Sequence, residues 1–160
     1  MTTIKSKSII IAENKAASYH YNLLEKFEAG LKLTGSEVKS AKLGQVNFKQ
    51  SYISLAAGDT PKAWLKKFYI SPYKPAGLAL KIYQPDRPRE LLLTKKELYY
   101  LIGKTQVKGL TIIPIVLYTT NSFLKLTIAL ASGKTKFDKR VQIKKRESDR
   151  QIREQFKRSR

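Results

Sequence analysis

The chain has 160 residues, about the length of one domain, and its 32 Lys and Arg against 12 Asp and Glu give a net charge of +20. A charge of this size attracts polyanions, most often nucleic acid, whereas an anionic membrane would call for one concentrated basic helix. Cysteine is absent and histidine occurs once, which excludes disulfides and thiolate metal sites and predicts no cofactor. With no apolar run of membrane-spanning length and no signal-peptide core, the expected location is the cytoplasm.

The first third of the chain predicts two short helices and one long strand. Asn14 is placed to cap a weak first helix. Residues 23–33 alternate between apolar odd positions and mostly polar even positions, which is the pattern of a half-buried strand. Thr34 and Glu37 have the spacing of a capping box, so a second helix is expected to begin there and to stop at Gly44.

The middle of the chain alternates in the same way and predicts three further strands. These strands cover residues 52–57, 63–70 and 78–82, and a Gly-Asp turn signal follows the first of them. Within the second strand, Trp64 and Phe68 fall on the same face, and both are expected in the core.

A third helix and a hairpin are predicted in the remaining part of the apolar region. A second capping box begins a helix over residues 94–103, where a glycine is expected to end it. The apolar runs 112–118 and 124–130 are joined by an Asn-Ser pair that suggests a hairpin turn. Pro114 lacks an N–H, so it should lie on a sheet edge or at a bulge.

Six or seven short strands with about three short helices indicate a mainly β fold. A small OB-like closed β-barrel is the most economical arrangement for residues 1–133, because closure removes unpaired sheet edges. A β-sandwich is the alternative, since strand alternation fits both architectures.

The composition changes near Gly133 and divides the chain into an RNA-binding barrel domain, 1–133, and a basic tail, 134–160. The tail has 12 basic and 4 acidic residues, and too few large apolar side chains to offset the entropy cost of ordering. We expect it to be disordered in isolation, although acid-first pairs such as Asp149 and Arg153 give it helical potential. A tail that stays solvated is the alternative.

Two side chains stand out against the basic background of the barrel domain. His20 is flanked by two tyrosines and suits base stacking or a phosphate contact better than catalysis, because no orienting partner is evident. Glu28 interrupts a positive strand face, either to form a salt bridge with Lys26 or Lys32 or to accept a hydrogen bond from a base edge or a ribose 2′-OH. The sequence has no phosphate-binding loop and no nucleophile motif, so an enzyme is disfavoured.

Lysines and aromatic residues supply further candidate contacts. Lys39, Lys42 and Lys49 lie on or just after the second predicted helix, either as phosphate contacts or as a solvated face. Nine Tyr, six Phe and one Trp among many lysines suit base stacking, although most of them are expected in the core. At the start of the tail, residues 133–140 place Phe137 among basic residues and one acid, which is the strongest local candidate for gripping a nucleotide.

Four stretches of the chain form a specific combination through their order and spacing. They are Phe27-Glu28-Ala29-Gly30 through Gly35-Ser36-Glu37-Val38-Lys39-Ser40, then Ser51-Tyr52, then Pro85-Asp86-Arg87-Pro88-Arg89-Glu90-Leu91-Leu92-Leu93, and finally Gly133-Lys134 through Asp138-Lys139-Arg140. In this combination the chain resembles the SmpB family, the SsrA-binding proteins of bacteria.

The resemblance implies an OB-like barrel that binds the tRNA-like domain of tmRNA, in place of a missing anticodon stem, and enters stalled ribosomes in trans-translation. It implies that the tail becomes helical at the decoding site and in the empty mRNA channel of the small subunit. Charged tmRNA would add elongation factor Tu as a partner, and a monomer is expected. Together with the lysines of the second helix, the RNA-binding residues would be Asn14, Lys15, His20, Glu28, Lys39, Lys42, Tyr52, Lys134 and Lys136. The ribosome-directed residues would be Phe137, Asp138, Lys139, Arg140, Ile143, Lys144 and Arg146.

A few positions depart from the family pattern, and two other functions compete with it. Glu90 and Thr135 replace common lysines, and Thr94 replaces a common Asn or His, without removing a core element. The first competing function is a structural ribosomal protein with a basic tail. The second is a small nuclease that would depend on His20.

Overall fold

The computed structural model describes residues 8–75, 77, 82–121, 123–135, 147–152 and 154–155. No helix within these ranges is long and apolar enough to cross a membrane. Residues 147–152 are helical, and Arg150 donates a hydrogen bond to Glu154 over 2.9 Å. The other elements follow in the order β1 (Ile9–Glu13), α1 (Lys15–His20), β2 (Tyr21–Leu31), α2 (Gly35–Lys42), β3 (Val46–Asn47), β4 (Tyr52–Ala56), β5 (Lys62–Lys66), β6 (Tyr69–Ile70), β7 (Arg89–Leu92), α3 (Lys95–Thr105), β8 (Leu110–Thr120) and β9 (Phe123–Gly133).

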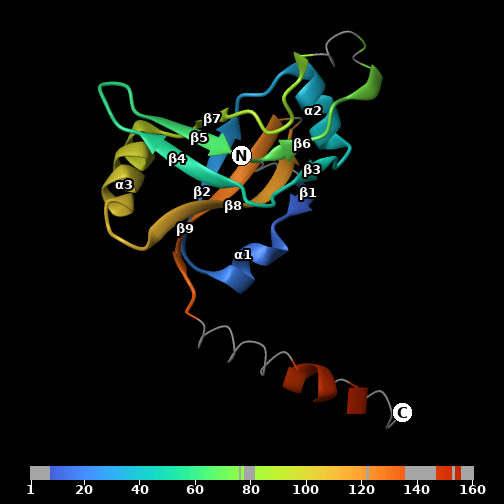
Figure 1. The fold of residues 1–160 in the computed structure, drawn as a ribbon, viewed down its shortest axis with the longest axis vertical. Coiled ribbons are helices and arrows are strands. Elements are labelled where there is room, and N and C mark those ends of the chain that lie inside the picture. The colour runs from blue at the N-terminus through green and yellow to red at the C-terminus, as the bar shows by residue number, and fades with distance from the viewer. Residues whose placement is uncertain are drawn as a thin grey trace, which may run out of the picture.

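Six strands form a closed antiparallel ring. Hydrogen-bonded neighbours run β8–β4–β5–β7–β2–β9, and β9 pairs again with β8, while β1 adds to β8 and β3 pairs with β6 separately. Closure of the ring confirms the predicted mainly β, OB-like fold over the sandwich alternative. In Figure 1, α2 and α3 lie on opposite sides of the ring and α1 lies below it.

The interior of the ring is an apolar core. Alternate side chains of β5, β8 and β9 point inward, and Leu65, Leu117 and Leu126 are fully buried. Leu101 of α3 adds to this core, while Ala17 of α1 packs on a smaller cluster formed by β8 and β9. Each fully buried leucine stabilises the fold by about 2 kcal/mol, so the ring is a firm support for the groups on its surface.

Both predicted capping boxes are present. The Thr34 hydroxyl accepts the amide of Glu37, whose carboxylate accepts the Thr34 amide over 2.8 Å. Thr94 and Glu97 repeat this exchange at the start of α3, where the carboxylate accepts the Thr94 amide over 2.9 Å. These reciprocal bonds satisfy backbone donors that have no partner in the first helical turn, which is why both helices begin where the sequence predicts.

The two predicted glycine stops have different outcomes. Gly44 lies just beyond α2 with a φ of 74°, a conformation that favours glycine, and the helix ends there as predicted. The predicted stop at Gly103 is wrong, because α3 continues to Thr105. Thr105 donates its side-chain hydroxyl to the Leu101 carbonyl over 2.9 Å, so the last turn is completed by a side chain.

Residues 63–70 do not form one strand. Between β5 and β6, Lys67 has a φ of 54°, in the left-handed region, and this reverses which side of the chain faces the core. Leu65 is buried before this point and Phe68 after it. Phe68 is therefore in the core as predicted, whereas Trp64 lies half-buried on the opposite face of β5.

Three strands, β1, β3 and β7, have no counterpart in the sequence prediction. β1 consists largely of consecutive apolar residues and β3 of two residues, so neither shows an alternating pattern. In β7 a charged side chain, Arg89, occupies a core position and hides the pattern. The predicted strand 78–82 lies outside the described residues except for Ile82, which is 87% exposed and not in a strand.

The β8–β9 hairpin follows the prediction and extends it at both ends. Asn121 has a φ of 47°, as a tight turn requires. The turn sets a register in which Tyr118 pairs with Lys125. The register shifts between Pro114 and Val116, so the proline lies at a bulge, one of its two predicted places.

A buried ion network ties α2 to β7. Glu37 and Arg89 are both fully buried, and Arg89 Nε donates to Glu37 Oε1 over 2.9 Å. Arg87 Nη2 donates to the other carboxylate oxygen over 2.6 Å. Burial alone raises the pKa of Glu37, but hydrogen bonds from Arg87, Thr34 and Arg89 outweigh burial and hold this pKa below its ordinary value. The network therefore links the first turn of α2 to β7.

Candidate RNA-binding surface

A hydrogen-bonded cluster surrounds Glu28 on the outer face of β2, β8 and β9. The alternation of β2 turns Glu28 outward, and its side chain is 53% exposed. Lys125 of β9 donates its ammonium to one carboxylate oxygen, and Tyr118 of β8 donates its hydroxyl to the other. The partner of Glu28 is thus Lys125 on the neighbouring strand, and the expected salt bridge with Lys26 or Lys32 is wrong.

The cluster holds a defined protonation state at neutral pH. Hydrogen bonds from Lys125 and then Tyr118 keep the pKa of Glu28 below its ordinary value. Burial, with the Glu28 carboxylate second, raises the pKa of Tyr118 to about 12. Glu28 is therefore a carboxylate whose two oxygens are oriented by protein donors, and their remaining lone pairs point to solvent.

The Glu28 cluster lies in a groove of about 660 Å³. Lys26 and Thr127 line the groove beside the cluster, and the groove as a whole offers two ammonium groups, a carboxylate and four hydroxyls. This mixture can bind phosphates through the lysines and accept or donate hydrogen bonds to a 2′-OH or a base edge.

Asn14 anchors α1 to β8. Its amide side chain donates to the Pro114 carbonyl over 2.9 Å, and its backbone N–H donates to the Ile115 carbonyl over 2.7 Å. The helix begins after Asn14 as predicted, but the side chain makes no capping bond. Lys15, the first helical residue, is exposed and available to a phosphate.

His20 and Lys134 meet at the end of α1. The Lys134 amide donates to the His20 carbonyl over 3.0 Å, and its ammonium donates to the Ser18 carbonyl over 2.7 Å. A cation at the C-terminal end of a helix compensates carbonyls that have no helical partner. The imidazole of His20 is exposed and lies edge-on to Tyr19 with ring centroids 4.9 Å apart.

A second groove, of about 310 Å³, joins α1 to the turn before β4. Asn14 and His20 line one side, and Lys49 and Gln50 line the other. Gln50 has a φ of 62°, in the left-handed region, and the backbone N–H of Lys49 donates a hydrogen bond to Asn47 Oδ1 over 2.8 Å. These two features give the turn a defined shape. Tyr52, two residues after Gln50, is exposed at the start of β4.

The predicted residues thus fall into three separate places. Glu28 lies on the strand face, and Asn14, Lys15, His20 and Lys134 gather around α1 with Tyr52 following the turn opposite. Lys39 and Lys42 are exposed on α2, apart from both. The remaining predicted residues lie outside the described part of the chain: Lys136, Phe137, Asp138, Lys139, Arg140, Ile143, Lys144 and Arg146.

Sequence reasoning missed Tyr118 and Lys125, although a signal for them existed. A two-residue turn at residues 121–122 fixes the pairs 120–123 and 118–125 by counting outward. The pair of β2 with β9 then places Thr127 opposite Glu28 and Lys125 diagonal to it. The sequence did not by itself show that β2 and β9 are neighbours.

Fold and surface together define a class of protein. A small closed β ring with exposed lysines, tyrosines and a polar charged groove is typical of RNA-binding domains that combine phosphate contacts with base stacking. The particular family is shown by comparison with known proteins. A model of the family described as SmpB protein matches residues 11–158, and the chain belongs to this family.

Curated relatives agree with the family match. The SsrA-binding protein of Sulfurihydrogenibium sp. (strain YO3AOP1) is 47% identical over 148 residues, which cover 92% of this chain and 94% of the relative. That of Aquifex aeolicus (strain VF5) is 46% identical over 155 residues, covering 96% of both chains. A chain from a solved structure, described as "tmRNA-SmpB: a journey to the center of the bacterial ribosome", superposes with a TM-score of 0.64. It is 39% identical, and the match covers 78% of this chain and 85% of that chain.

Proposed function

We propose that this protein binds the tRNA-like domain of tmRNA, the SsrA RNA, and delivers it to stalled ribosomes for trans-translation. The observation that carries the proposal is the family match over residues 11–158, almost the full chain, to proteins named for SsrA binding. The net charge of +20 and the Glu28 groove supply the matching chemistry. The protein acts by binding, without catalysing a reaction.

The RNA face combines the Glu28 groove with the surface around α1. Lys15, Lys134 and Lys136 bind phosphates and set the position of the RNA. His20 and Tyr52 are exposed rings that stack on bases or meet the ribose. Glu28 accepts a hydrogen bond from a base edge or a 2′-OH, which adds selectivity that lysines alone lack. Asn14 supports this face by holding α1 on β8.

The tail carries the ribosomal part of the function. Residues 137–146, with Phe137, Asp138 and Arg140 first, meet the decoding site, and the rest follows the empty mRNA channel as a helix. The mixture of 12 basic and 4 acidic residues suits a segment that folds on a phosphate-lined wall. The protein works as a monomer in the cytoplasm and meets elongation factor Tu through charged tmRNA.

A gel shift against two RNAs tests the proposal. The full chain is titrated with the tRNA-like domain of tmRNA and with ordinary tRNA, each at a low and a high salt concentration. Contacts to phosphates alone weaken with salt to the same extent for both RNAs. We expect a preference for the tRNA-like domain that persists at the higher salt. Equal binding of both RNAs would contradict the proposal and favour a structural ribosomal protein with a basic tail.

A further inference from the structure

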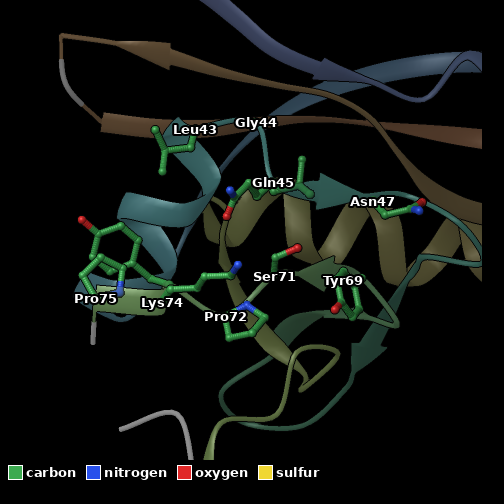
Figure 2. A pocket seen from close by; sticks show the side chains of 11 residues that line it. Leu43, Gly44, Gln45, Asn47, Tyr69, Ser71, Pro72, Lys74 and Pro75 are labelled. Carbon is green, nitrogen blue, oxygen red and sulfur yellow. The ribbon is translucent and has the colours of Figure 1, made fainter. Parts of the chain in front are cut away.

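A third groove, of about 840 Å³, lies between the C-terminal end of α2 and the segment after β6. Figure 2 shows Leu43 and Gln45 on one wall and Tyr69, Pro72 and Lys74 on the other. Among the described residues, it shares no lining residue with the Glu28 groove or with the groove between α1 and the turn before β4. Asn47, Ser71 and Tyr73 also line it.

Hydrogen bonds to the backbone hold together the two walls of this groove, which we call the α2 groove. β3 pairs with β6, so that Asn47 lies opposite Tyr69. Beyond the pair, the Ser71 amide donates to the Gln45 carbonyl over 2.9 Å, and the Ser40 hydroxyl of α2 donates to the Ser71 carbonyl over 2.6 Å. The groove is therefore formed before any ligand binds, which reduces the entropy cost of binding.

Aromatic and apolar surface is exposed in the α2 groove. Tyr69 is 43% exposed and Leu43 is 63% exposed, so both offer apolar surface to a ligand in the groove. The ring of Tyr73 is half-buried, and the ammonium of Lys39 lies 5.5 Å from its centroid. A cation over one face of an aromatic ring leaves the other face to a base, and the cation itself can bind the adjacent phosphate.

The charge around the α2 groove has one sign. Lys74 lines the groove, Lys39 lies over the ring of Tyr73, and none of the described residues that line the groove is an acid. The carboxylate of Glu37, on α2 itself, is buried against two arginines and presents no negative charge to solvent. Lys74 and Lys39 are therefore the charged side chains placed at the groove, with Lys42 in the last turn of the same helix as Lys39, and the ligand that complements them is a polyanion.

We propose that the α2 groove binds a single-stranded RNA segment, with one unstacked base against Tyr69 and Tyr73 and the adjacent phosphates on Lys39, Lys42 and Lys74. This inference rests on the proposed function in that the partner is RNA. Because the α2 groove is separate from the RNA face around Glu28 and α1, the protein can bind two RNA segments at once. The RNA face would bind the folded RNA by its shape, and the α2 groove would bind a single-stranded segment through an extruded base.

Chemical shift mapping by NMR on the full chain tests the inference without relying on a variant. The probe is a uridine oligonucleotide of about ten residues, compared with an oligomer of the same backbone without bases. We expect the uridine oligonucleotide to shift the amides of Gly44, Asn47 and Ser71. The oligomer without bases should bind more weakly and shift these amides less, because it keeps the phosphates but lacks the base that stacks.

A variant measures the contribution of the stacked base. Tyr73→Ala should weaken binding of the uridine oligonucleotide between about fivefold and 150-fold, the range that loss of one base–aromatic stack gives. Tyr99→Ala is the matched control, because Tyr99 is 55% exposed on α3 and outside the groove. Binding of the tRNA-like domain should change little in either variant, and an unchanged melting temperature checks the fold.

Three results would overturn the inference. The first is oligonucleotide binding that leaves the groove amides unshifted, and the second is equal binding by the oligomer without bases. The third is displacement of the oligonucleotide from the groove by a glutamate-rich peptide at lower concentration, which would assign the groove to a protein partner. Each of these results leaves the proposed function intact if the protein still binds the tRNA-like domain and Glu28→Ala weakens that binding. Failure of the groove inference can therefore be distinguished from failure of the proposed function.

Discussion

Substitution of Glu28 by alanine should separate specific from non-specific RNA binding. The Glu28 carboxylate is held by Tyr118 and Lys125, and its removal should delete the hydrogen bond that we propose it accepts from the tRNA-like domain. A hydrogen bond to a charged group contributes about 1.5–3 kcal/mol, so the Kd for this RNA should rise between about tenfold and 150-fold. The Kd for ordinary tRNA should fall slightly, because a negative charge has been removed from a phosphate-binding surface.

The same substitution should have little effect on folding. Glu28 and Lys125 are 53% and 37% exposed, and ion pairs at such positions contribute about 0–1 kcal/mol to the free energy of unfolding. The matched control is Glu25→Ala, because Glu25 lies on the same strand and accepts a tyrosine hydroxyl, that of Tyr100, over 2.8 Å. Parallel gel shifts and thermal melts of the two variants should show a loss of affinity in Glu28→Ala alone.

A double-mutant cycle tests whether Tyr118 acts through Glu28. Tyr118→Phe keeps the ring and removes the hydroxyl that orients the carboxylate, so it should raise the Kd for the tRNA-like domain a few-fold. In the Glu28→Ala background it should have no further effect. Additive losses would mean that Tyr118 contacts RNA itself. Equal weakening of both RNAs by Glu28→Ala would refute the reasoning about the acceptor.

Four further predictions follow from the ion network, the titrating groups and the tail. Glu37→Gln should lower the free energy of unfolding in urea by about 3–5 kcal/mol, because it leaves buried Arg89 without its anionic partner. Since the pKa of Glu37 is lowered from 4.5, its stabilising effect is complete above that pH and is lost as the pH falls through the lowered value. A series of melts below pH 5 should therefore show a larger loss of stability in the parent than in Glu37→Gln, which keeps the other ion-paired carboxylates. Tyr118 should ionise near pH 12 by ultraviolet absorbance, and Glu28→Gln should lower this transition only in part, because burial, the largest cause, remains; an unmoved transition would mean that burial alone sets it. Deletion of residues 141–160 should spare affinity for the tRNA-like domain and abolish tagging of stalled chains, and a loss of RNA affinity would contradict the division between domain and tail.

Local chemistry made much of the fold predictable. Capping boxes placed the first turns of α2 and α3, and the turn at Asn121 placed the β8–β9 hairpin, because each depends on residues at most three apart. The reversal at Lys67 of which side chains face the core was not predictable, because nothing in the sequence shows that this lysine has a left-handed backbone conformation. β7 was missed for another reason: its core-facing position is held by Arg89, whose partner Glu37 is 52 residues away.

The candidate site shows the same division between local and distant information. Glu28 was identifiable as an acid on a basic strand face, and the structure gives it different partners because they lie on strands nearly a hundred residues away. Lys39 was assigned to a helix face, but the ring beneath it, Tyr73, comes from a segment with no secondary structure pattern. Single candidate side chains could be identified from the sequence. Clusters of side chains from distant segments could be identified only once the structure showed which segments are neighbours.

The two capping boxes show why a shared motif does not imply a shared role. In both, a glutamate three residues after a threonine caps the helix. Glu97 remains at the surface of α3, and its role ends with the cap. Glu37 is buried and also binds Arg87 and Arg89, so the cap of α2 is joined to β7 through one carboxylate. A helix held in this way presents its lysines at a fixed distance from the segment after β6, which is the condition that a preformed groove for RNA requires.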